Sequence, residues 1–384
     1  MIDLPRGFRA CGVHAGLKKD GQLDVGMLVS DSPCRGAAVF TKNLVVAAPV
    51  VFDRQLLLDH PESLAGVVLN SKNANAVTGE QGMRDAEAMS AYAQRALATA
   101  NRMLVMSTGV IGNPMPMDKI RAGIDLGVPA LGPDGTGLSL AMMTTDTRPK
   151  TATATLSNGA RLTGFAKGAG MIHPDMATML SIVATDAELS LTELRSLVAW
   201  VSEHSFNCIS VDGDTSTNDT FLVLANGRAG PVDPSEFRAA LLSLSQDLAR
   251  QVAFDGEGAA HHLTIEVEGL ADFAQARAIG RTIATSPLVK TAIYGRDANW
   301  GRILAAAGRA GVPFDPELAN LWLEDLQFLS AGQPKLHDPD VERDRLSRQA
   351  LTIRLQLGSG PGRATVWTCD LTDDYIRINA EYRT

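Results

Sequence analysis

Hydrophobic residues follow two different spacings along this 384-residue chain. Continuous apolar runs at 64–70 and 102–109 predict buried strands, because a strand that is covered on both faces shows no polar alternation. Over 80–100 the apolar residues recur at helical spacing, which predicts an amphipathic helix. Strand-like and helical segments therefore alternate from the start of the chain.

Two further helices are indicated by the residues of their first turns. Ser190 and Glu193 form a capping-box pattern, which predicts a helix over 190–204. Pro234 follows an aspartate and stands at the first position of a helix that we expect over 233–253.

The remaining segments favour β-structure. Residues 151–168 predict a hairpin that turns at Ser157-Asn158-Gly159. Residues 351–384 predict several strands in a row, and GSGPG (358–362) is interpreted as a hairpin turn because no helix follows it. The pattern indicates an α/β or α+β protein with a mixed-sheet core over 1–280 and a smaller α/β domain over 281–384.

Composition and charge exclude several classes of function. The net charge is −8 with no basic block, which disfavours nucleic acid and anionic membranes as partners. No apolar run is long enough to span a membrane, and the N-terminus lacks a signal peptide. The four cysteines are far apart, so we expect reduced thiols and a cytoplasmic protein. His261 and His262 are neighbours on an expected strand and point to opposite faces, so no metal site is predicted.

One segment carries candidate chemistry. Residues 167–180 read KGAGMIHPDMATML, with a small Ala177-Thr178 pair between a turn and an apolar run. A threonine at a chain N-terminus can use its own α-amino group as the base that activates its hydroxyl. Attack of the Thr178 hydroxyl on the Ala177 carbonyl would cut the chain and create that terminus. Taken alone, the pair is better explained by an ordinary strand in which Thr178 packs or caps.

The wider chain resembles a known family. The sequence is similar along nearly its whole length to the bifunctional ornithine acetyltransferases, also called glutamate N-acetyltransferases, of arginine biosynthesis. Residues 167–180 resemble the self-cleavage motif of that family. Further matching segments are STGVIG (107–112), MTTDTRPK (143–150), VDGDTSTND (211–219), DGEG (255–258), SPLVKTAIYGRDANWGRIL (286–304) and INAEYRT (378–384).

The resemblance implies a fold and specific roles. It implies an α+β mixed-sheet sandwich of the self-cleaving N-terminal-nucleophile type, cut into an α chain (1–177) and a β chain (178–384). Thr178 would accept the acetyl group, and Thr108 with Gly109 would form the oxyanion hole. The positions that match substrate-binding residues are Thr145, Lys167, Thr178, Glu257, Asn379 and Thr384.

The same resemblance implies substrates and assembly. Acetyl would move from N2-acetylornithine to glutamate without a cofactor, in an α2β2 heterotetramer, and acetyl-CoA is an open alternative donor. Two other functions are alternatives: an N-terminal-nucleophile amidohydrolase or aminopeptidase with the same self-cleavage, and a non-catalytic binding protein, which would need a broken nucleophile or oxyanion hole. The sequence departs from the usual family pattern at Ser71 and Lys72, where the family segment begins NAG and so has alanine and glycine at these two positions. It also has DGEGAAHH where DGEGATK is commoner, Ala298 where proline is usual, and an Arg-Thr ending where Thr-Thr is frequent.

Overall fold

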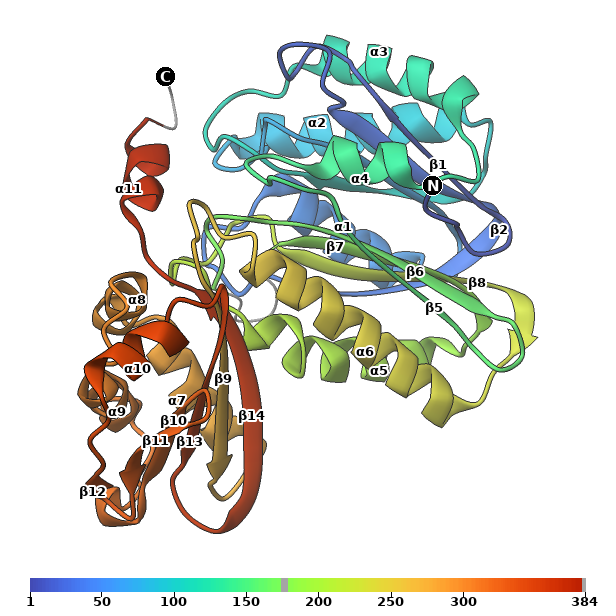
Figure 1. Ribbon diagram of the computed structural model, residues 1–384. Coiled ribbons are helices and arrows are strands. Elements are labelled where there is room, and N and C mark those ends of the chain that lie inside the picture. Colours follow the sequence, from blue (N-terminus) through green and yellow to red (C-terminus); the bar gives the residue numbers. More distant parts are fainter. Residues whose placement is uncertain (174–178, 382–384) are drawn as a thin grey trace. The chain divides into compact units, whose positions relative to one another are not determined.

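The computed structural model describes residues 1–173 and 179–381 (Figure 1). These residues form two compact units. Among the described residues, the first unit contains 1–168, 179–207 and 215–248, and the second contains 169–173, 208–214 and 249–381. No helix in the described part of the chain is long and apolar enough to cross a membrane.

Within the described residues, the first unit holds an eight-stranded mixed sheet. Its order is β4-β3-β2-β8-β7-β6-β5, with β1 paired to β2. The pairs β3/β4 and β7/β8 are parallel and the others are antiparallel. The strands are β1 (Phe8–Val13), β2 (Val25–Phe40), β3 (Leu64–Asn70), β4 (Arg102–Ser107), β5 (Lys150–Thr155), β6 (Arg161–Lys167), β7 (Leu180–Glu188) and β8 (Thr220–Pro231).

Strand β2 is shared by two halves of this sheet. Its residues 25–29 pair with β1 and β3, whereas residues 35–40 pair with β8. Apolar side chains from both halves join one buried cluster, so the halves pack against each other as the predicted mixed-sheet sandwich. Members of this cluster include Leu28, Leu69, Met106, Ile182 and Leu222.

Helices cover the outer faces of the sandwich (Figure 1). Helices α2 and α3 pack on the half formed by β1–β4, and α5 packs on β2 and β8. The predicted capping box at Ser190 and Glu193 begins α5. The helices of this unit are α1 (Ala48–Asp59), α2 (Gly79–Ala96), α3 (Met117–Gly127), α4 (Thr136–Met142) and α5 (Leu191–Glu203), and α6 (Pro234–Ala253) runs from the first unit into the second.

The second unit is built on a six-stranded mixed sheet with the order β12-β11-β10-β13-β9-β14, counted over the described residues. Helices α7, α8 and α9 share an apolar core with it. Its elements are β9 (His262–Gly269), α7 (Phe273–Ala284), α8 (Pro287–Tyr294), α9 (Trp300–Gly308), β10 (Asn320–Leu323), β11 (Leu326–Ser330), β12 (Gln333–Pro334), α10 (Pro339–Arg345), β13 (Ala350–Gln356), β14 (Gly360–Cys369) and α11 (Asp373–Ala380).

Two expectations for the C-terminal residues are wrong. GSGPG does join β13 to β14, but these strands do not form a hairpin, because β9 lies between them and pairs with both. The connection crosses the end of β9 so closely that a Cβ on Gly360 would lie 2.0 Å from the Leu270 carbonyl oxygen. Residues 373–380 form α11 rather than a strand, since the Thr372 hydroxyl caps the helix by accepting from the Tyr375 N–H.

Candidate active site

The predicted oxyanion residues follow the end of β4. Because β3 and β4 are parallel neighbours, the loops after both strands leave the sheet at the same edge. Four backbone hydrogen bonds join these loops and fix the geometry of Thr108 and Gly109. They run from the N–H of Thr108 to the carbonyl of Asn70 (3.1 Å), from Val110 to Lys72 (3.1 Å), from Ala74 to Val110 (3.1 Å) and from Gly112 to Ala76 (3.0 Å).

Gly109 is required by its surroundings. Its φ of +134° is unfavourable for other residues. A Cβ at this position would lie 2.2 Å from the carbonyl carbon of Lys72. Within the described residues, neither the Gly109 N–H nor the Thr108 hydroxyl makes a hydrogen bond. Both donors are therefore available to stabilise negative charge on a substrate oxygen.

Buried amide side chains hold this loop. The Nδ2 of Asn218, just before β8, donates to the carbonyl oxygens of Ala74 (2.6 Å) and Ser107 (2.9 Å). The Ser107 hydroxyl donates to Oδ1 of Asn70 over 2.7 Å. The sequence analysis assigned no role to Asn70 or Asn218. A polar residue at the end or the start of a buried strand is unusual, and this could have indicated that both residues support the site.

The loop after β3 is strained where the sequence departs from the family pattern. Lys72, Asn75 and Val77 have φ of +73°, +47° and +57°, a region that is unfavourable for a side chain and most so for β-branched valine. The usual family segment has glycine at position 72. Lys72 thus keeps a glycine-like backbone conformation while adding an exposed ammonium beside the loop that carries Thr108 and Gly109.

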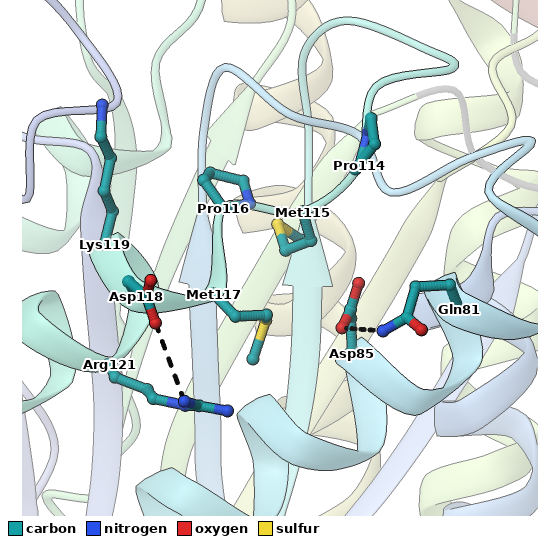
Figure 2. Close-up of a pocket in the computed structure, with 9 residues that line it drawn as sticks. All are labelled: Gln81, Asp85, Pro114, Met115, Pro116, Met117, Asp118, Lys119 and Arg121. Carbon is teal, nitrogen blue, oxygen red and sulfur yellow. Dashed lines mark hydrogen bonds and ion pairs between the residues drawn. The ribbon is translucent and has the colours of Figure 1, made fainter.

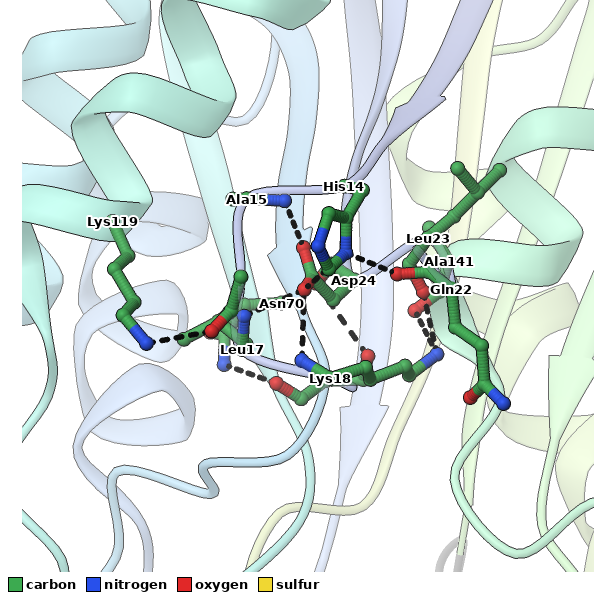
Figure 3. Close-up of polar contacts among 12 residues, drawn as sticks. His14, Ala15, Leu17, Lys18, Gln22, Leu23, Asp24, Asn70, Lys119 and Ala141 are labelled. Atoms are coloured by element: carbon green, nitrogen blue, oxygen red, sulfur yellow. Dashed lines mark hydrogen bonds and ion pairs between the residues drawn. The ribbon is translucent and has the colours of Figure 1, made fainter. Parts of the chain in front are cut away.

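The loop between β1 and β2 supports the same edge (Figure 3). The buried Asp24 carboxylate accepts backbone N–H groups of Ala15 (2.6 Å), Leu17 (2.7 Å) and Lys18 (2.9 Å). The Asp24 carbonyl in turn accepts the N–H of Ser71 over 2.9 Å. Burial is the main cause that lowers the pKa of Lys18 to about 8.

Lys167 is the last residue of β6 and lies near two buried carboxyl groups with opposite properties. Asp146 forms a 2.6 Å ion pair with Lys150 and accepts the Gly168 N–H over 2.6 Å. Burial favours the neutral form of Asp146, but the charges of Lys150 and Lys167 outweigh it and hold its pKa below the ordinary value. Thr145, beside Asp146, is half-buried.

Asp219 is the second carboxyl group near Lys167. Burial raises its pKa well above the ordinary value, against the opposing charge of Lys167 and hydrogen bonds from Ser216 and Thr41. Its Oδ2 is buried and has no hydrogen-bond partner among the described residues. The surroundings therefore favour the ionised form of Asp146, whereas burial favours the neutral form of Asp219. Sequence reasoning assigned a role to neither residue.

In the second unit, the structure brings Glu257 and Asn379 together. The Nδ2 of Asn379 on α11 donates to Oε2 of Glu257 over 2.9 Å. The Glu257 N–H donates to the Ala169 carbonyl over 2.9 Å, so the loop that carries Glu257 is fixed to the segment before the expected cut. A Cβ on Gly170 would lie 2.5 Å from this carboxylate, so glycine is required for that approach.

The Asp212 carboxylate also binds residues of the segment 169–173. Its carboxylate accepts the N–H groups of Met171 (2.6 Å) and Ile172 (2.8 Å) and lies 3.2 Å from the Tyr375 hydroxyl, which donates to it. Helix α11 and residues 169–173 are thus tied to one carboxylate within the second unit.

Three predicted site residues lie outside the described residues: Ala177, Thr178 and Thr384. The described residues contain no group of three or more His, Cys, Asp or Glu side chains that could hold a metal ion. An open pocket of about 590 Å³ between α2 and the start of α3 contains none of the predicted site residues (Figure 2). It is lined by Gln81, Asp85, Pro114, Met115, Pro116, Met117, Asp118, Lys119 and Arg121.

Comparison with known proteins covers nearly the whole chain. A model of the ArgJ family matches residues 9–384. The chain is 47% identical over 397 residues to the arginine biosynthesis bifunctional protein ArgJ of Symbiobacterium thermophilum, covering 100% of this chain and 98% of that one.

Solved structures give similar matches. The crystal structure of ArgJ from Bacillus halodurans is 36% identical with a TM-score of 0.50, covering 52% of this chain and 98% of that chain. The ornithine acetyltransferase of Mycobacterium tuberculosis, solved with ornithine, is 39% identical with a TM-score of 0.44, covering 46% of this chain and 96% of that chain.

Proposed function

This chain belongs to the ArgJ family and has ornithine acetyltransferase activity in arginine biosynthesis, and we propose that it acts through an acetyl-threonine at Thr178. In this proposal the chain first cuts itself between Ala177 and Thr178, and the new α-amino group of Thr178 serves as the base for its hydroxyl. The acetyl group then moves from N2-acetylornithine to Thr178 and from Thr178 to glutamate.

Each half of the reaction balances without a cofactor. The Thr178 oxygen attacks the acetyl carbonyl of N2-acetylornithine, its proton passes through the α-amino group to the leaving nitrogen, and ornithine departs. The amine of glutamate then attacks the acetyl ester, and its proton returns to the Thr178 oxygen. Both steps place negative charge on the acetyl oxygen, which the Thr108 hydroxyl and the Gly109 N–H can stabilise.

The observation that carries this proposal is the preformed oxyanion loop. Two donors without a partner in the described residues stand in a loop that four backbone hydrogen bonds and the Asn218 side chain hold in place. A donor that is fixed before the reaction needs no reorganisation in the transition state.

The length of a solved relative supports the proposed cut. The crystallised Bacillus halodurans chain is 98% covered but matches only 52% of this chain, so it is about half as long. Cleavage before Thr178 gives fragments of 1–177 and 178–384, each about half of the whole.

The remaining roles are proposed from the resemblance. By the resemblance, the substrate-contacting residues would be Thr145, Lys167, Glu257, Asn379 and Thr384. Glu257 is suited to bind a substrate ammonium because Asn379 orients its carboxylate. We also propose an α2β2 assembly, and a cytoplasmic location, with which four buried cysteines that form no disulfide among the described residues are consistent.

A denaturing gel combined with a transfer assay tests the proposal. The purified protein should run as two chains, and Thr178→Ala should remain intact and inactive because no hydroxyl can attack the Ala177 carbonyl. A single intact band from active protein would exclude Thr178 as an N-terminal nucleophile. Release of acetate instead of N-acetylglutamate formation would favour the amidohydrolase alternative, and thiol release from acetyl-CoA would show that it is a second donor.

A further inference from the structure

Lys72 lies directly against the loop that carries Thr108 and Gly109. The Val110 N–H donates to the Lys72 carbonyl over 3.1 Å, and a Cβ on Gly109 would lie 2.5 Å from the Cα of Lys72. Both loops leave the parallel strands β3 and β4 at the same edge of the sheet. The Lys72 side chain therefore begins beside the two donors that the proposed function assigns to the acetyl oxygen.

A lysine at position 72 is not explained by stability. Its φ of +73° suits glycine, which the related family usually has here, and strains any residue with a Cβ. The side chain is exposed, and within the described residues its ammonium makes no hydrogen bond and no ion pair. Strained residues cluster at active sites and ligand clamps, so Lys72 is a candidate for binding a ligand.

Lys72 also lies within electrostatic reach of a second ammonium group. Burial is the main cause that lowers the pKa of Lys18, and the positive charge of Lys72 lowers it further, against two nearby carboxylates. The Lys18 ammonium is held in place, because it donates to the carbonyls of Leu23 over 2.6 Å and Leu140 over 3.4 Å. Two like charges repel each other, and an anion bound at Lys72 would offset that repulsion.

The same set of charges includes positions that the resemblance assigns to substrate. Asp146, next to Thr145, acts on the pKa of Lys18 and accepts the N–H of the residue after Lys167 over 2.6 Å. The charge of Lys167 in turn acts on the pKa of Asp146. Lys72 is thus an exposed cation in a connected group of charges of the first unit, and that group reaches the expected substrate positions.

The two amino acids of the proposed reaction differ in the charge of their side chains. Both carry an α-carboxylate, but the side chain of glutamate ends in a carboxylate and that of ornithine in an ammonium. We propose that the Lys72 ammonium binds the side-chain carboxylate of glutamate and repels the ammonium of ornithine, so that Lys72 is a specificity-determining residue. The assignment rests on the proposed oxyanion role of Thr108 and Gly109.

Other cations near this edge do not fit the role. Lys119 donates to the Gly16 carbonyl over 2.6 Å. Arg102 is exposed like Lys72 but is the first residue of β4, at the opposite end of the strand from Thr108. Arg102 therefore serves as a matched control, because its replacement removes one exposed positive charge from the same strand pair without changing the loop.

The test removes the charge from either partner in turn. The unmodified protein and Lys72→Gln are each assayed with glutamate and with glutamine, which has the size of glutamate but a neutral side chain. Lys72→Gln should lower kcat/KM for glutamate about tenfold and change that for glutamine little. Lys72→Arg should keep the preference for glutamate because it keeps the charge, and Arg102→Gln should behave like the unmodified protein. Equal changes for both acceptors, or no change, would overturn the assignment.

The acetyl donor gives a second comparison. In Lys72→Gln, kcat/KM for N2-acetylornithine should stay the same or rise, because the repulsion of its side-chain ammonium is lost. An equal fall for donor and acceptor would contradict selection by side-chain charge. In the unmodified protein, added salt should weaken the preference for glutamate over glutamine, since an exposed ammonium is screened.

These outcomes separate this assignment from the proposed function. A normal transfer rate for Thr108→Val would remove the reacting oxygen from this loop and would defeat both. A slow Thr108→Val together with an unchanged glutamate preference in Lys72→Gln would defeat the assignment of Lys72 alone.

Discussion

The side-chain amide of Asn379 donates a 2.9 Å hydrogen bond to Oε2 of Glu257. Asn379 stands near the end of α11, and its amide also donates to the Tyr375 carbonyl over 3.0 Å within that helix. Glu257 is 9% exposed and belongs to the loop after α6. The bond therefore orients a nearly buried carboxylate, which can then bind a substrate ammonium without a large reorganisation.

Replacing Asn379 with leucine should weaken substrate binding. Hydrogen bonds to charged groups contribute about 1.5–3 kcal/mol, so we expect KM for N2-acetylornithine and glutamate to rise about ten- to a hundredfold. Self-cleavage should remain normal, because its proposed parts lie in the first unit. Arg377→Ala is the control, since it removes only an exposed ion pair with Asp374 on the same helix. An unchanged KM in steady-state kinetics would remove Asn379 from the binding site.

Thr108→Val should slow acetyl transfer on the order of a hundredfold, the usual effect of losing one oxyanion donor. Valine has nearly the shape of threonine, and the backbone bond from Thr108 to Asn70 remains. The matched control is Thr153→Val, which makes the same exchange at an exposed position of β5. The measurement is kcat of the cleaved enzyme, and a normal value for Thr108→Val would mean that its hydroxyl does not contact the reacting oxygen.

Local sequence patterns were sufficient for most elements of the fold. The apolar run at 64–70, the helix beginning at Ser190 and the hairpin at 151–168 depend on residues close in sequence, and all three are confirmed. Local sequence patterns could not predict the pairing of β9 with β13 and β14. It joins residues about ninety positions apart, and no local signal distinguishes such a sheet from a hairpin.

The candidate site, like the fold, could be predicted only in part from local sequence. The motif around 107–112 predicts Thr108 and Gly109 as donors, but the reason why position 109 must be glycine is its close approach to Lys72 in the loop after β3. Asp219 stood within a matching segment without any assigned role. Only the fold reveals that its Oδ2 lacks a hydrogen-bond partner among the described residues and that the N–H of Thr220, next to it, donates to the Met179 carbonyl.

Lys72→Gly should stabilise the protein. A non-glycine residue in the left-handed region costs roughly 1 kcal/mol, and Lys72 has a φ of +73°. Glycine relieves this strain without removing a described side-chain contact, so the thermal midpoint should rise. Ala98→Gly, at a φ of +52° after α2, is the control for strain relief far from the oxyanion loop and should also be stabilising. A lower midpoint for Lys72→Gly alone would show that the Lys72 side chain makes a stabilising contribution.

The stability of the first unit should depend on pH through Asp53. This residue is 2% exposed, and burial raises its pKa well above the ordinary value despite the Val105 N–H bond. The unfolded chain loses this proton above about pH 4 while the folded protein retains it. The folded state then binds more protons, so the contribution of Asp53 to the free energy of unfolding falls as pH rises from about 4 to its folded pKa.

Asn cannot ionise, and its side-chain oxygen can still accept the Val105 N–H. The advantage of Asp53→Asn in the free energy of unfolding should therefore be small near pH 4 and grow as pH rises. Urea unfolding of both proteins at several pH values between 4 and 8 measures this difference. Asp118→Asn, at a fully exposed side chain, should show no comparable trend. If the difference in the free energy of unfolding between the two proteins narrowed with rising pH, Asp53 would be ionised in the folded protein.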